Sequence, residues 1–187
     1  MKYNLILVAV IGSITLISCA GNSDKKAAGV LADKTADGGP TVNSEDAKTG
    51  TFSIDGKEVS AGVTTQYFGD KEKGNFSVLC QHNEGSDPAG ANFELLQVTF
   101  INEKDATTNP ALKIYSNGSS LPMTEPEPGI VAVSLTGVGN GLGSDEFTGS
   151  EKSTGTITVK NRTIEIKDLS LFTSEGEKKV ITASLPF

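Results

Sequence analysis

The single histidine of the chain, His82, lies two residues after Cys80. Both residue types bind zinc, and histidine is also a common general base for a serine or cysteine nucleophile. In a strand, a spacing of two places both side chains on one face. A structural zinc site needs four ligands, and the other cysteine is Cys19. No G-x-S-x-G elbow occurs either, so the sequence does not predict a hydrolase. Cys80 is expected to face the core with a free thiol.

Carboxylates are the second group that could do chemistry. Three candidate ligand loops each hold two of them: Asp70 with Glu72, Glu84 with Asp87, and Asp145 with Glu146. Their oxygens suit a hard cation if two loops meet in space, whereas a solvated loop needs no ligand at all. Paired carboxylates also perform glycoside hydrolysis, although an acidic chain contains many such pairs. The carboxylates alone predict no metal and no catalytic residue.

Aromatic and glycine-rich segments supply two weaker candidates. Tyr67, Phe68 and Tyr115 could form a stacking platform for a sugar, or pack in the core. Residues 140–147 read Asn-Gly-Leu-Gly-Ser-Asp-Glu-Phe, which resembles one calcium-binding nonapeptide of parallel β-helix repeats. Those repeats bind calcium between successive turns, and this chain has a single copy. A glycine-rich loop is therefore the favoured interpretation.

The elements that must position these residues are short strands. Asp55-Gly56 lies between two alternating runs and predicts a hairpin with a type I′ turn. A parity break between Ile166 and Leu169 predicts a β-bulge near Asp168. The strands are expected at 51–54, 57–60, 63–68, 75–81, 93–101, 112–115, 130–138, 156–159, 163–172 and 180–185.

Such regularly spaced strands predict an all-β domain over residues 51–187, either an antiparallel β-sandwich or a small barrel. The segment 20–50 contains few large apolar residues and cannot bury enough surface to offset its ordering entropy. Residues 19–50 are therefore expected to form a flexible, disordered tether that begins at Cys19.

The amino terminus carries a targeting signal. A basic start is followed by an apolar stretch over 5–17 that is too short to cross a bilayer. The next residues, Leu16-Ile17-Ser18-Cys19, resemble the lipobox of bacterial lipoproteins. That resemblance implies a signal peptide over 1–18, cleavage before Cys19, and a diacylglyceryl group with palmitate-type acyl chains on Cys19. No cofactor beyond this lipid anchor is expected.

The same resemblance bears on location. Ala20 follows the cysteine in place of the aspartate that retains lipoproteins at the inner membrane, so the outer membrane of a Gram-negative cell envelope is expected. The periplasmic and the surface-facing orientation both stay open. The opening hairpin, Phe52 to Val59, is similar to that of small lipoproteins from Bacteroidota.

The net charge of the chain limits the classes of partner that are expected. The chain carries 16 basic and 23 acidic side chains, a formal net charge of −7, and cleavage removes Lys2 to leave −8. An acidic surface repels phosphate backbones, which excludes nucleic acid as a partner. The sequence thus predicts a membrane-anchored, non-enzymatic β-domain that binds an envelope protein or stabilises an assembly. The alternative is a surface glycan-binding module or a weak glycan hydrolase.

Overall fold

The computed structural model describes residues 41–69, 71, 74–84, 92–108, 112–116, 121, 128–139 and 141–187, without the side chains of 41–47, Glu84 and Asn92. The elements are β1 (Thr41–Ile54), β2 (Lys57–Phe68), β3 (Asn75–Glu84), β4 (Asn92–Phe100), α1 (Glu103–Thr108), β5 (Lys113–Ile114), β6 (Ile130–Gly137), β7 (Phe147–Thr148), β8 (Thr156–Lys160), β9 (Thr163–Phe172) and β10 (Lys178–Pro186). The predicted signal peptide, Cys19 and the tether up to residue 40 lie outside the described residues.

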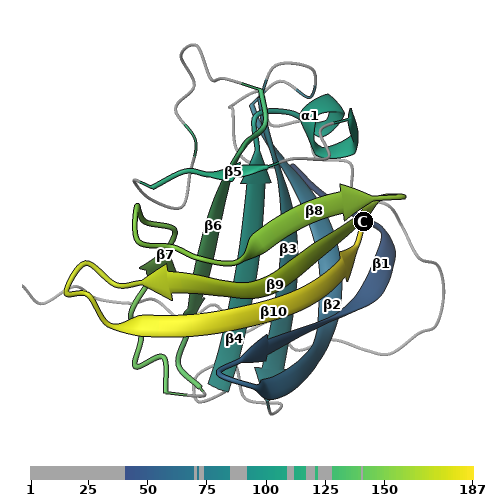
Figure 1. The fold of residues 1–187 in the computed structure, drawn as a ribbon. Coiled ribbons are helices and arrows are strands. Elements are labelled where there is room, and N and C mark those ends of the chain that lie inside the picture. Colours follow the sequence, from purple (N-terminus) through teal and green to yellow (C-terminus); the bar gives the residue numbers. More distant parts are fainter. Residues whose placement is uncertain are drawn as a thin grey trace, which may run out of the picture. The chain divides into compact units, whose positions relative to one another are not determined.

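Eight of these strands close into an antiparallel barrel. Their order is β1-β2-β3-β4-β6-β7-β9-β10, and β10 pairs with both β9 and β1 (Figure 1). Neighbours in sequence are neighbours in space, which is an up-and-down arrangement. β8 pairs with β9, and the short β5 pairs in parallel with β6. The predicted all-β class is confirmed, and of its two architectures the barrel is the correct one.

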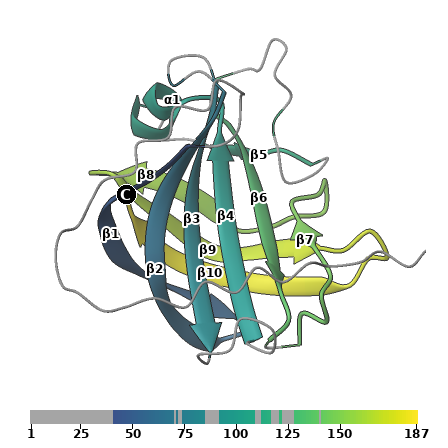
Figure 2. The same ribbon diagram turned by 180° about the vertical axis from the view of Figure 1, so that it is seen from behind.

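The barrel interior is filled by side chains. Inward positions alternate along each strand, as in Phe76, Val78 and Cys80 of β3 and Leu96, Val98 and Phe100 of β4, all with 0% exposure. A ring of eight strands encloses a space that side chains alone can fill. Figure 2 shows β2, β3, β4 and β6 forming one wall, with β9 and β10 crossing behind them. The core accordingly lies between these two groups of strands.

Two local signals in the sequence are confirmed. Asp55 and Gly56 have φ values of 50° and 84°, the positive angles of a type I′ turn. The register shifts between Ile181 and Ala183 of β10, opposite Asp168, whose φ of 48° marks the expected bulge. Asp55 also binds β10, because the Val180 N–H donates to Oδ1 at 2.9 Å. Burial raises the pKa of Asp55, but this hydrogen bond and Lys179 outweigh it, so the pKa is lowered overall.

Four elements differ from the expectation, and one of them is β7, a two-residue strand that was not expected. β1 begins at Thr41, and Lys48, Thr49 and Gly50 pair with β2, so the domain starts before residue 51. β2 is one strand across Gly62, because pairing on both sides holds the glycine extended. α1 was not expected, since its six residues show no apolar stripe. It starts where the Asn102 side chain accepts a hydrogen bond from the Asp105 N–H at 2.8 Å, an N-cap.

A polar network joins α1 to the barrel at the end where β2 finishes. The Tyr67 hydroxyl donates to Glu103 Oε2 at 2.5 Å, and Arg162 Nη2 lies 3.1 Å from Glu103 Oε1. The Arg162 guanidinium also stacks over the Phe187 ring, 4.8 Å from its centroid. Burial and then the Glu103 hydrogen bond raise the pKa of Tyr67 to about 12. The hydrogen bond from Tyr67 is the main cause that lowers the pKa of Glu103.

Tyr67→Phe should lower the free energy of unfolding near neutral pH by about 1 kcal/mol, because the bond to a 31% exposed carboxylate is lost. The pKa of Glu103 is lowered on folding. Its stabilisation is therefore complete above the unfolded pKa and is lost as pH falls through the folded pKa. Urea denaturation near neutral pH and near pH 3 tests this. The loss should shrink at the lower pH, whereas Tyr115→Phe, outside this network, should show no such pH dependence.

Candidate ligand-binding groove

The predicted carboxylate loops are only partly within the described residues. Asp145 and Glu146 are both exposed and directly precede β7. Glu84 ends β3, but its side chain, like Asp70, Glu72 and Asp87, lies outside the described part. Among the residues that are described, no three His, Cys, Asp or Glu side chains are grouped so that they could hold a metal ion.

In the glycine-rich stretch that resembles a calcium nonapeptide, residues 141–146 are described and lie between β6 and β7. Leu142 turns inward and is 1% exposed, joining the core cluster. Main-chain hydrogen bonds hold the loop, from Ser144 N to Gly137 O and from Asp145 N to Leu142 O, both at 3.0 Å. Gly137 is required here, since a Cβ would lie 2.2 Å from the Phe93 carbonyl oxygen. The loop therefore sets where Asp145 and Glu146 emerge.

β7 is the element that brings distant parts of the chain together. Its two residues pair with Ser134 and Leu135 of β6 on one side, and Thr148 pairs with Phe172 of β9 on the other. Gly149 follows, and a Cβ there would lie 2.4 Å from Ile114 Cγ2 and 2.8 Å from the main-chain oxygen of Tyr115. This close approach brings the segment after β5 against β7.

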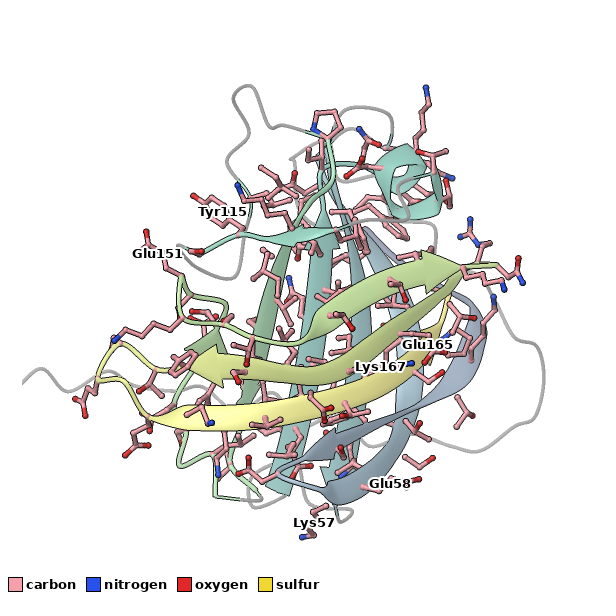
Figure 3. All side chains as sticks on the ribbon, in the orientation of Figure 1. Lys57, Glu58, Tyr115, Glu151, Glu165 and Lys167 are labelled. Carbon is pink, nitrogen blue, oxygen red and sulfur yellow. The ribbon has the colours of Figure 1, made fainter. Side chains whose placement is uncertain are left out.

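Two adjoining hollows follow on the outer wall, and we name them together the β7–β9 groove. They enclose about 420 and 380 Å³ and share Ser116, Ser150, Phe172, Thr173 and Ser174. Asp145, Glu146, Thr148 and Gly149 line the first, and Glu151, Lys152 and Gly176 line the second. Figure 3 shows Tyr115 and Glu151 on this side of the molecule. The groove is open to solvent and of a size typical of small-ligand sites.

Two turns fix the walls of the groove. The Ser150 N–H donates to Ser153 Oγ at 2.9 Å, and the Lys152 N–H donates to Ser150 Oγ at 3.1 Å. In the turn between β9 and β10, the Thr173 N–H donates to the main-chain oxygen of Glu177 at 2.9 Å. The Glu177 N–H in turn donates to Thr173 Oγ1 at 3.1 Å. Both turns are held by the chain itself, so the lining side chains stand on defined backbone.

Two alternatives were open for Tyr67, Phe68 and Tyr115, a sugar platform or packing in the core, and Tyr67 packs in the core. Its parity on β2 points it inward, where it is 6% exposed and packs 5.2 Å from the Phe76 ring. Phe68 and Tyr115 are half-buried. The aromatic residue that lines the groove is Phe172, which the sequence analysis missed. The parity after the bulge was its signal, because Leu169 and Leu171 face inward and leave Phe172 outward.

Cys80 and His82 both lie on β3 and face inward, as expected. Cys80 is 0% exposed, and burial raises the pKa of its thiol to about 12, so it stays protonated at neutral pH. A protonated, buried thiol is neither a nucleophile nor a zinc ligand. His82 Nδ1 lies 2.9 Å from Glu94 Oε2, and the Glu94 side chain is 0% exposed. The partly exposed His82 ring thus contacts a buried side chain of β4.

These features define a closed, eight-stranded antiparallel barrel with a side-chain-filled interior and an open polar groove on its outer wall. Comparison of the chain with protein-family models, curated proteins and solved structures finds no match. Within the described residues, no helix has the length and apolar character needed to span a membrane.

Proposed function

We propose that this chain is a lipid-anchored protein of the bacterial cell envelope whose barrel binds a ligand in the β7–β9 groove without chemical turnover. The lipobox Leu16-Ile17-Ser18-Cys19 supports the anchor. Acyl chains on Cys19 would contribute about 0.8 kcal/mol for each buried CH₂, so more than one chain gives stable attachment. The tether over 19–40 would then let the barrel reach partners beyond the lipid surface.

The packed interior is the reason for placing the proposed binding site on the outer wall. An eight-stranded barrel that holds a small ligand inside needs an empty lumen. Here phenylalanine, leucine, isoleucine and valine side chains occupy that space. Binding through the β7–β9 groove requires no rearrangement of this core. Its Ser, Thr, Asp and Glu side chains offer hydrogen bonds, and Phe172 offers an apolar face.

Attachment is tested by measuring the intact mass of the protein purified from native membranes, beside the Cys19→Ser variant. The wild-type chain should begin at Cys19 and carry acyl mass, whereas Cys19→Ser should carry none and leave the membrane fraction. Protease treatment of intact cells then distinguishes a surface-facing barrel, which is digested, from a periplasmic one, which is protected. A wild-type chain without acyl mass would refute the proposed anchor.

A further inference from the structure

We infer that the β7–β9 groove binds a neutral carbohydrate chain, an inference that rests on the binding function proposed above. Hydroxyl side chains form most of the shared floor, namely Ser116, Ser150, Thr173 and Ser174. A hydroxyl both donates and accepts a hydrogen bond, and so matches the hydroxyls of a sugar, which do the same. An apolar ligand would cover these hydroxyls without replacing the hydrogen bonds that they make to water, which is costly.

Phe172 provides the complementary apolar surface. Both hollows share it, and strand parity after the Asp168 bulge places it on the outer wall. A sugar ring presents one face of C–H groups, and such a face packs on an aromatic ring. An apolar ring surrounded by hydroxyls is therefore suited to a ligand with C–H faces and polar edges.

Charge selects among the ligands that carry hydroxyls. Asp145, Glu146 and Glu151 line the groove, and Lys152 is the basic side chain beside them. Ionised carboxylates accept hydrogen bonds from sugar hydroxyls, and these charge-assisted bonds are about twice as strong as neutral ones. The same carboxylates repel uronates, sulfates and phosphates. A neutral glycan is accordingly favoured over an anionic one.

The shape of the groove indicates a chain and not a single sugar. The two hollows adjoin through the residues that they share, and both open to solvent. An open groove lets an internal stretch of a polymer pass through, whereas an enclosed pocket admits only an end or a monomer. The turns at Ser150 to Ser153 and Thr173 to Glu177 hold the walls in place before binding. Such preorganisation reduces the entropy cost of association.

The test uses the lipidated protein from membranes, held in detergent, on an array of neutral oligosaccharides of glucose, galactose, mannose and N-acetylglucosamine. Sulfated and uronate-containing chains and basic peptides are included as competitors. We expect retention of neutral chains only, and calorimetry with the best of them gives the dissociation constant. Phe172→Ala should weaken binding by about tenfold or more, Phe172→Tyr should restore most of it, and Asp145→Asn should weaken it as well.

Phe68→Ala is the matched control, because Phe68 is also half-buried, belongs to β2 and does not line the groove. It should leave the dissociation constant unchanged, and thermal unfolding shows that each variant is folded. No retained neutral glycan, or binding that Phe172→Ala leaves intact, would overturn the inference. Binding of a basic peptide would overturn the carbohydrate class, and binding of an anionic glycan would overturn the neutral charge of the ligand; both would leave the proposed groove binding in place.

Discussion

Phe76→Ala should lower the free energy of unfolding by about 3–5 kcal/mol, the range for removing a large aromatic side chain from a packed core. Phe76 is 0% exposed. Its ring lies 5.2 Å from Tyr67, 5.7 Å from Phe187 and 6.4 Å from Phe100, measured between centroids. One side chain therefore joins β2, β4 and the residue that follows β10. The cavity left by alanine would remove contacts with all three.

Denaturant titration of wild type and variant measures this loss, because a lower midpoint at an unchanged slope reports stability alone. Phe172→Ala is the control with the same chemical change. Phe172 is half-buried on the outer wall, so its loss should cost about 1 kcal/mol or less. Comparable losses in the two variants would contradict a core enclosed by the barrel and a groove outside it.

The parts of the fold that could be predicted are those that depend only on residues close together in the sequence. Asp55-Gly56 specifies its hairpin because a type I′ turn needs two positive φ angles, and both occur. The bulge at Asp168 is visible because the apolar parity breaks there. Whether the strands form a sandwich or a barrel depends on β10 pairing with both β9 and β1. That closure joins strands more than one hundred residues apart, and no local pattern reports it.

In the candidate groove, too, features set by neighbouring residues could be predicted, and contacts between distant residues could not. Asp145 and Glu146 were candidate ligand residues, with a solvated loop as the alternative, since adjacent carboxylates in a loop are apparent from sequence. Their joining with Ser116 and Phe172 was not predictable, because it depends on β7, a strand of two residues that is too short to show alternation. Whether Tyr67 packs in the core or faces outward was also left open by the sequence, and the structure places it in the core. Its direction follows from its register with Phe76 of β3, and sequence reasoning did not fix that register.

His82→Ala should lower the free energy of unfolding by about 1–2 kcal/mol, because it removes one hydrogen bond from the buried Glu94 side chain. Glu94 is 0% exposed, and its Oε2 lies 2.9 Å from His82 Nδ1. The His82 side chain is 26% exposed, so water can replace part of the lost hydrogen bond. This places the expected cost below that of a fully enclosed pair. Denaturant titration gives the value.

Gln81→Ala is the neighbouring control, since Gln81 faces outward on the same strand and is exposed. It should change the free energy of unfolding by no more than about 0.5 kcal/mol. A loss from Gln81→Ala as large as that from His82→Ala would indicate a general weakening of β3. In that case the effect would not belong to the contact between His82 and Glu94.

A double-mutant cycle measures how much of the stability loss in His82→Ala depends on Glu94. Glu94→Leu keeps a side chain of similar size and removes the carboxyl group that His82 contacts, at a position that is 0% exposed. If the His82 ring serves to offset the burial of Glu94, then His82→Ala should cost less in the Glu94→Leu background than in wild type. The double variant should then be more stable than His82→Ala alone. Strictly additive losses would mean that the 2.9 Å contact between His82 and Glu94 stabilises nothing, and that the His82 side chain acts through packing.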